Sequence, residues 1–319
     1  MSKVLGMETA SAEPAGRSHP PGAVVARTQR KELVFGPVAF ELLIEEGAGF
    51  EVDAEVGRFC EPPGEQQVVG RVCCAVRRGP ALPRQVPWPE QNTLRFFALD
   101  GGEDGYRVEG RELLATVRRL GAESFAASIE LAPGSEGGLA LLRGVMGAVV
   151  HLQGGLLLHA AAVELDGRAV VFLGPSGAGK STAAGLCRGA RCLAYDHVAV
   201  APTTLGYRVW GLPLGSASTL PDGPVGAYPL IAALRVRRST SAPSIERIDG
   251  VPALFIVREA VESADLSPVG EADYLRAAME LAECVEVGEI HTVLGVELNT
   301  LLNGFFRPSS GESAGGRPR

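Results

Sequence analysis

The sequence predicts a mixed α/β (α+β) protein in which a smaller β-rich part precedes a larger part that contains both strands and helices. Before residue 138, short apolar runs separated by turn signals are typical of strands. Apolar residues then recur at helical spacing over Gly138–Gln153. A predicted hairpin, a glycine-rich loop and a short helix follow in that order. We therefore predict a domain over residues 31–137 and a second domain over residues 138–306.

The first predicted domain consists mainly of strands. Apolar runs bounded by turn residues predict strands over Val38–Glu45, Val68–Val76, Thr93–Leu99 and Ser124–Leu131. One short helix is predicted over about Arg111–Leu120. We find no catalytic motif in this domain, and we interpret Trp88 in its proline-rich loop as a packing anchor.

The second predicted domain begins with the core-facing helix over Gly138–Gln153. Two strand-like runs follow, Leu156–Leu165 and Arg168–Leu173. The dipeptide Asp166-Gly167 between them is a strong signal for a two-residue hairpin turn. The second strand of this hairpin leads directly into the glycine-rich loop.

Composition and charge restrict the class of protein. Of 319 residues, 46% are hydrophobic and 21% are charged, which is enough apolar material for a core. The net charge is −7, and no basic block resembles a nucleic-acid-binding stripe. The most hydrophobic stretch, Leu139–Val163, contains Arg143 and two histidines, which argues against a membrane span. We expect no nucleic-acid partner and no membrane segment.

The chain ends and the cysteines suggest a cytoplasmic protein. Residues 1–30 and 307–319 are predicted to be flexible, and the first of them lacks the apolar run of a signal peptide. The six cysteines form no C-x-x-C pair, so we expect reduced, mostly buried thiols. Cys187 and Cys192 are the one pair of interest, because both flank the glycine-rich region.

The glycine-rich loop is the most specific signal in the chain. It matches the phosphate-loop pattern G-x-x-x-x-G-K-[ST] in full, in the strand–loop–helix order that the pattern requires. Its glycines let backbone N–H groups turn toward phosphate oxygens, Lys180 supplies a cation, and the Ser181 hydroxyl can coordinate Mg²⁺. We therefore expect ATP and Mg²⁺ as ligands, with GTP left open. The predicted nucleotide-binding residues are Gly174, Pro175, Ser176, Gly177, Ala178, Gly179, Lys180, Ser181 and Thr182.

An acidic residue follows this loop after a short helix and a strand. We predict a helix over Ser181–Arg188 and a strand over Arg191–Tyr195, which ends at Asp196. A carboxylate there can hold Mg²⁺ or accept the proton of an attacking hydroxyl, or it can be an exposed acid at a strand–turn junction. The short spacing and the antiparallel hairpin argue against the common parallel-sheet phosphate-loop folds.

These segments resemble the C-terminal catalytic domain of the HPr kinase/phosphorylase family, including HPr-kinase-like proteins encoded beside peptide-modification genes. The resemblance rests on Leu158–Val163, the hairpin, Gly174–Thr182 and Leu193–Asp196, and it continues more weakly through Val209–Gly215. It implies a phosphoenolpyruvate-carboxykinase-type P-loop fold with a mixed sheet. It also implies ATP-dependent transfer of a γ-phosphoryl group to a hydroxyl, on a serine of a small protein or peptide or on a small molecule. A homo-oligomer is left open.

The resemblance assigns roles to individual residues. His159 matches a histidine close to the transferred phosphoryl group, and Asp196 matches the first acid of an Asp-Asp pair that serves as base and metal ligand. From the residues alone, a single histidine in an apolar strand is more often a core residue. The implied catalytic residues are Asp196, His159 and Lys180, and the implied metal ligands are Ser181 and Asp196.

Three features depart from that family. His197 stands in place of the second acid, Thr182 replaces a glutamate after the loop serine, and the later Asn/Arg-rich signature is absent. His197 could be a substitute ligand, a substrate contact or a neutral replacement. The departures weaken the case for the reverse phosphorolysis reaction and for HPr itself as substrate. They motivate an alternative, a catalytically reduced nucleotide-binding or regulatory module of the same fold.

Three arginines on a late predicted strand are further candidates for binding phosphate or substrate. Because alternate residues of a strand face opposite sides, Arg235 and Arg237 share one side and Arg238 takes the other. The simplest interpretation of all three is a solvated strand face.

Overall fold

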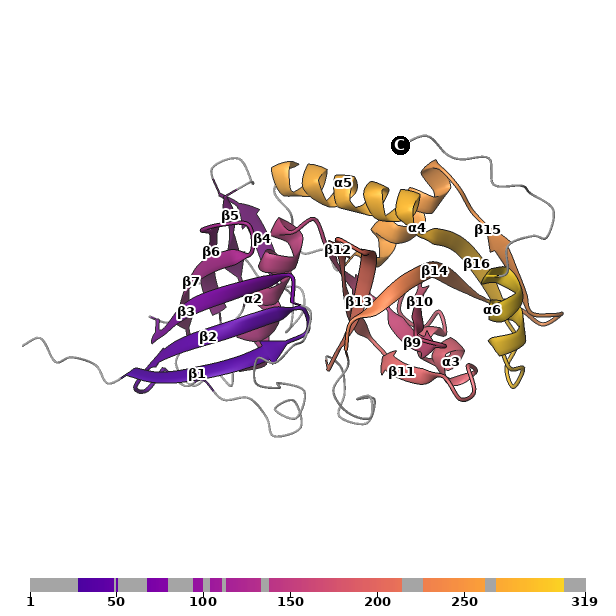
Figure 1. Ribbon diagram of the computed structural model, residues 1–319, viewed down its shortest axis with the longest axis horizontal. Coiled ribbons are helices and arrows are strands. Elements are labelled where there is room, and N and C mark those ends of the chain that lie inside the picture. The colour runs from indigo at the N-terminus through magenta and orange to yellow at the C-terminus, as the bar shows by residue number, and fades with distance from the viewer. Residues whose placement is uncertain are drawn as a thin grey trace, which may run out of the picture.

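The computed structural model describes residues 28–48, 50, 68–79, 94–99, 104–110, 113–132, 138–213, 226–261 and 268–306. These residues form two mixed sheets, one of seven and one of nine strands, with helices packed around them (Figure 1). The mixed α and β class therefore agrees with the prediction. Most of the predicted leader, the predicted tail over 307–319, Cys60 and Trp88 lie outside the described residues.

The seven-stranded sheet is built by the N-terminal part of the chain. Its strands are β1 (Thr28–Phe35), β2 (Val38–Glu45), β3 (Gly70–Arg78), β4 (Arg95–Ala98), β5 (Gly105–Glu109), β6 (Leu113–Arg119) and β7 (Ser124–Leu131). They are ordered β1-β2-β3-β7-β6-β5-β4, and β3 runs parallel to both of its neighbours. Buried and exposed residues alternate along β3, which is the pattern of a sheet with one face on the core. Strand β1 begins at Thr28, slightly before the predicted start of this domain at residue 31.

The helix predicted over Arg111–Leu120 is wrong, because Leu113–Arg119 forms strand β6. This strand pairs on both sides, with β5 and with β7, and its buried residues Leu113, Ala115 and Val117 alternate along the chain. The segment is rich in residues that favour helices, but burial of one alternating face in a sheet outweighs that local preference. Strands β1 and β5 were not predicted either.

The nine-stranded sheet carries the glycine-rich loop. Its strands are β8 (Leu156–His159), β9 (Ala161–Leu165), β10 (Arg168–Leu173), β11 (Arg191–Ala194), β12 (His197–Thr203), β13 (Gly206–Leu212), β14 (Tyr228–Arg238), β15 (Ser244–Arg247) and β16 (Glu286–Thr292). The main order is β11-β9-β10-β14-β13-β12-β8, with β16 also paired to β14 and β15 paired to β16. Strand β14 runs parallel to β10 and β16. Asp166 and Gly167 both adopt positive φ, 53° and 77°, which confirms the predicted two-residue hairpin turn.

The helices cover both sheets and link them. They are α2 (Gly138–Leu152), α3 (Lys180–Gly185), α4 (Val251–Ala260), α5 (Pro268–Cys284) and α6 (Asn299–Phe306). Helix α2 contributes to one continuous core with the first sheet, and Trp210 and Leu212 of β13 join that core from the second sheet. In the second sheet, α3 and α6 pack on one face, and α4 and α5 pack on the other (Figure 1). The core therefore continues across the predicted boundary at residue 138.

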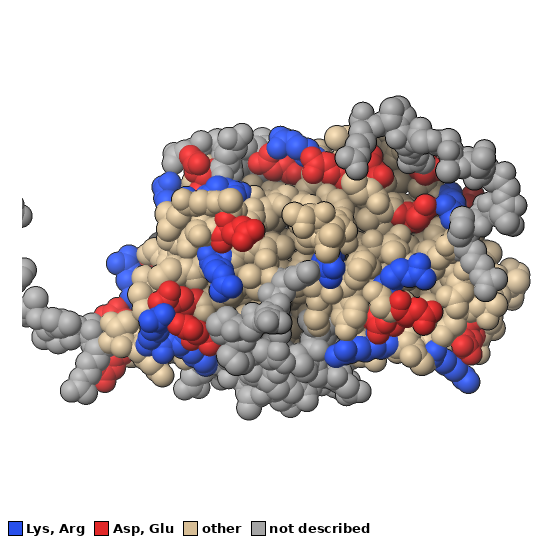
Figure 2. All heavy atoms as spheres, viewed as in Figure 1, with Lys and Arg blue, Asp and Glu red and all other residues tan. Residues whose placement is uncertain are grey.

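The surface and the cysteines bear on the remaining expectations. Acidic and basic side chains are interspersed over the face shown in Figure 2. Among the described helices, none has both the length and the apolar composition that a membrane crossing requires. The five described cysteines are free, and Cys73 and Cys284 are exposed, whereas we expected mostly buried thiols. Of the pair near the loop, Cys187 is buried and Cys192 is partly exposed.

Candidate functional site

Two chain crossings place the predicted site residues side by side. The chain passes from β8 to β9 at Ala160, and from β11 to β12 at Tyr195 and Asp196, so each crossing joins an end strand of the main sheet order to the second strand from the other end. The Ala160 N–H donates to the Asp196 carbonyl at 2.8 Å. In the β8–β12 ladder, His197 is the direct partner of His159. This register places His159 next to Asp196, although they are far apart in sequence.

The glycine-rich loop joins β10 to α3 in the conformation that its glycines permit. Gly174, Gly177 and Gly179 adopt φ values of 139°, 77° and 103°, in the region that favours glycine. Lys180 is buried, with 6% of its surface exposed. Its Nζ donates to the Gly174 carbonyl at 2.9 Å and to the Pro175 carbonyl at 3.2 Å. The ammonium group therefore lies within the loop, where phosphate oxygens could replace these carbonyls.

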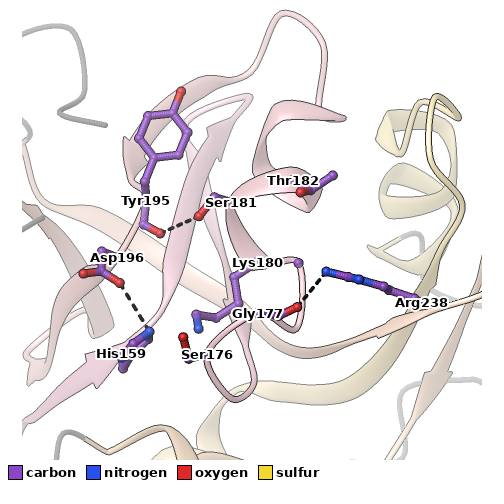
Figure 3. A pocket seen from close by; sticks show the side chains of 10 residues that line it. His159, Ser176, Gly177, Lys180, Ser181, Thr182, Tyr195, Asp196 and Arg238 are labelled. Atoms are coloured by element: carbon purple, nitrogen blue, oxygen red, sulfur yellow. Dashed lines mark hydrogen bonds and ion pairs between the residues drawn. The ribbon is translucent and has the colours of Figure 1, made fainter. Parts of the chain in front are cut away.

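A cavity of about 280 Å³ connects the loop with the crossing segment (Figure 3). The Ser181 hydroxyl donates to the Tyr195 carbonyl at 3.0 Å, which ties the start of α3 to the residue before Asp196. The cavity is lined by His159, Ser176, Gly177, Gly179, Lys180, Ser181, Thr182, Tyr195, Asp196 and Arg238. The structure thus brings the predicted catalytic and metal-binding residues to one cavity. Gly174, Pro175 and Ala178 belong to the loop but do not line it.

Two imidazoles flank the Asp196 carboxylate. His159 Nε2 lies 3.3 Å from Oδ1, and His197 Nδ1 lies 3.1 Å from Oδ2. The hydrogen bond from His197 lowers the pKa of Asp196, with further contributions from His159 and Lys180 and against the opposing effect of burial. Asp196 therefore remains a carboxylate near neutral pH. His197 is mostly buried and holds one carboxylate oxygen, a contact that the sequence left undecided.

Burial and neighbouring cations act on the other titratable groups of the site. Burial lowers the pKa of His159, Lys180 lowers it further, and Asp196 opposes both effects. Burial also lowers the pKa of Lys180. Arg143 of α2 is a further cation near His159 and Asp196, and burial lowers its pKa while Asp196 raises it. No motif in the sequence pointed to a role for Arg143 at this site.

The three arginines of β14 divide as the alternation predicts, but one of them belongs to the site. Arg235 and Arg237 both bind Glu289 of β16, through their Nε atoms at 2.7 Å and 3.1 Å. On the other side, Arg238 lines the cavity and donates from Nη2 to the Gly177 carbonyl at 2.7 Å. Arg238 is exposed, as a solvated strand face predicts, but it also lines the cavity. Arg238 lies at the loop because β14 pairs in parallel with β10, and the sequence alone does not show that pairing.

The residues of this cavity fit a nucleotide with a divalent cation. The loop offers backbone N–H groups and a buried ammonium group to phosphate oxygens. Mg²⁺ in nucleotide sites takes one or two protein oxygens and completes its coordination with phosphate oxygens and water. Ser181 and Asp196 supply oxygens of that kind within one cavity.

A comparison with known proteins gives a match within the part of the chain that carries this cavity. A family model described as "SynChlorMet cassette protein ScmC" matches residues 140–281, which is less than half of the chain. The matched segment includes the loop, His159, Asp196 and Arg238, but not the seven-stranded sheet. A search of curated proteins finds no match.

Proposed function

We propose that this chain is an ATP-dependent kinase that transfers the γ-phosphoryl group to a hydroxyl, with a serine of a small protein or peptide as the favoured acceptor. The observation that carries the proposal is that Asp196 and His159 line the same cavity as Lys180 of the phosphate loop. A loop alone would support only binding of the triphosphate. The carboxylate beside it adds a group that can accept the proton of an attacking hydroxyl.

Each residue of the site has a separate role in the proposed transfer. Lys180 and the loop N–H groups hold the phosphates and stabilise the charge that develops on them. Asp196 takes the proton of the acceptor hydroxyl as its oxygen bonds to the γ-phosphorus, and ADP leaves as the bond to the β-phosphate oxygen breaks. His197 and His159 orient the carboxylate through the two contacts described above. Mg²⁺ bound with ATP, held by Ser181 and Asp196, would neutralise phosphate charge.

A phosphoenolpyruvate-carboxykinase-type P-loop fold is part of this proposal. Strand β10, which leads into the loop, lies between antiparallel β9 and parallel β14, as in a mixed rather than a doubly wound sheet. Asp196 follows after one short helix and one strand. These features support the resemblance to HPr-kinase-like proteins. The description of the matched family names a cassette protein, so products of companion genes are the first acceptors to test.

A specific observation favours a second candidate, a nucleotide-binding module with reduced catalysis. Both oxygens of Asp196 are engaged by imidazoles, and His197 stands where the resemblance implies a second acid. Such a module would bind MgATP without forming any phosphorylated product. Its nucleotide occupancy would instead change the affinity for a protein partner.

Phosphoryl transfer and nucleotide binding can be separated with two variants. Candidate acceptors are incubated with MgATP and the full chain, and products are detected by mass spectrometry. Asp196→Asn should retain MgATP affinity but lose transfer, because it removes the proton acceptor and keeps the side-chain shape and one oxygen that can face Mg²⁺. Lys180→Ala should weaken MgATP binding by about tenfold or more.

Lys31→Ala is the matched control for Lys180→Ala, because Lys31 lies exposed on β1 of the other sheet. It should bind MgATP as the parent does. Normal transfer by Asp196→Asn would remove Asp196 as the base. Parent-like binding by Lys180→Ala would contradict the whole proposal.

A further inference from the structure

Arg238 is placed against the phosphate loop by the sheet itself. It is the last residue of β14, the parallel neighbour of β10 from which the loop departs. Its Nη2 donates to the Gly177 carbonyl, and its Nε lies 3.8 Å from where a Cβ would stand on Gly179. Gly177, Gly179 and Arg238 all line the cavity. Within the described part of the chain, Arg238 makes this one hydrogen bond, although its guanidinium carries several N–H donors.

The cavity has two chemically different ends (Figure 3). His159 and Asp196 lie at one end, Arg238 lies on the opposite side of the loop, and Lys180 lies between them. The proposed transfer requires the γ-phosphoryl group to lie near Asp196, which takes the proton of the hydroxyl that attacks it. A triphosphate in that orientation directs its α-phosphate and nucleoside away from Asp196, toward Arg238.

We propose that Arg238 is a further nucleotide-binding residue, which holds the loop at Gly177 and donates its other N–H groups to the α-phosphate end of the nucleotide. This inference rests on the proposed function, because the position of Asp196 sets the direction of the triphosphate. An arginine suits both tasks, since its planar fork can donate to a carbonyl and to a phosphate oxygen at once. The acceptor then enters from the end that carries His159 and Asp196.

The neighbouring Arg237 provides a matched control. It is the preceding residue of the same strand and carries the same charge, but its side chain faces the other side and pairs with Glu289 at 3.1 Å. It does not line the cavity. A loss of affinity caused only by a change in net charge would therefore appear in both variants, whereas a direct contact would appear only for Arg238.

The test is a titration of the full chain with MgATP and, separately, with MgADP. Arg238→Ala should weaken both by a similar factor of about tenfold or more, because both nucleotides carry the α-phosphate. Arg237→Ala should bind both within about twofold of the parent. Arg238→Gln can still donate to the Gly177 carbonyl but lacks the charge, so it should remain weak.

Three outcomes would overturn the inference. If Arg238→Ala weakens MgATP alone, the arginine contacts the γ-phosphate and the proposed direction is wrong. If Arg238→Ala binds as the parent does, there is no contact. If Arg238→Gln restores parent affinity, the residue only positions the loop. A parent chain that binds neither nucleotide would instead overturn the proposed function, whereas parent-like Arg238→Ala beside a defective Lys180→Ala removes this inference alone.

Discussion

The two sheets of the molecule use similar strands but distribute polar side chains differently. Beneath the seven-stranded sheet the core is apolar apart from His151 of α2, and ion pairs such as Arg30–Glu41 lie on the exposed side. In the nine-stranded sheet, polar groups are partly or fully withdrawn from solvent, among them Lys180, His197 and Glu289. Both sheets are mixed, so strand direction does not account for this difference.

The difference follows from how the chain runs through each sheet. In the second sheet the chain crosses at Ala160 and at Asp196 between strands that are far apart in the sheet order, and the loop begins where β10 ends. Backbone groups at the ends of strands need hydrogen-bond partners from outside a regular ladder. The Ala160 N–H, for example, donates to the Asp196 carbonyl. The same places leave side chains free to converge on a cavity. The polar side chains that line the cavity are therefore concentrated where regular pairing ends.

Replacement of Trp210 tests whether the two sheets share one core, and we expect it to change stability more than the other substitutions below. Trp210 belongs to β13 of the second sheet but is packed, with 2% of its surface exposed, in the core of the first. Trp210→Ala should lower the free energy of unfolding by about 3–5 kcal/mol in denaturant titrations. Leu294→Ala is the control, because Leu294 is 85% exposed and should change it by less than about 0.5 kcal/mol. A loss below about 1 kcal/mol for Trp210→Ala would mean that the cores are separate.

A pH-dependent contact between the halves gives the next largest effect. His151 of α2 stacks on Tyr274 of α5 at 3.7 Å and meets Tyr106 of β5 edge-on, with Asp273 and Arg276 nearby. Burial lowers the pKa of His151 to about 4. The unfolded chain, with a histidine pKa of about 6.5, then binds a proton that the folded chain does not. Protonation of His151 therefore leaves the free energy of unfolding unchanged above about pH 6.5. As the pH drops toward 4, it lowers that free energy by about 3 kcal/mol in total.

This pH dependence can be assigned by comparing two histidines. The free energy of unfolding is measured across that range for the parent, His151→Gln and His291→Gln. Removal of His151 should flatten the decline, whereas removal of His291, which is 35% exposed beside Glu289, should leave it in place. An unchanged decline in His151→Gln would assign it to other groups.

The smallest change in the free energy of unfolding is expected for ion pairs, and one pair from each sheet can be compared. Glu289 is 15% exposed and binds both Arg235 and Arg237, so Glu289→Gln should lower the free energy of unfolding by about 1–3 kcal/mol. Glu41 pairs with Arg30 at 3.1 Å, but both side chains are exposed, so Glu41→Gln should cost about 0–0.5 kcal/mol. Equal losses in denaturant titrations would show that withdrawal from solvent does not distinguish the two sheets.

The accuracy of the sequence predictions differed from element to element for physical reasons. Strands β2 and β7 were predicted with their observed bounds, because each is an apolar run bounded by turn residues, and burial also alternates along β7. The hairpin turn was predicted because positive φ at both central positions demands Asp-Gly or a similar pair. Strand β6 was predicted as a helix, because its local preference and its place in the sheet disagree.

The loop over residues 174–181, the hairpin before it and the helix α2 could be predicted from local patterns, since each depends on local backbone geometry or on a short repeat. The positions of His159 and His197 beside Asp196, and of Arg238 beside Gly177, became visible only in the folded chain. Those contacts depend on strand order and register, which are set by pairing between segments distant in the chain. A linear pattern identifies a residue that can bind phosphate, but the sheet determines which other residues lie beside it.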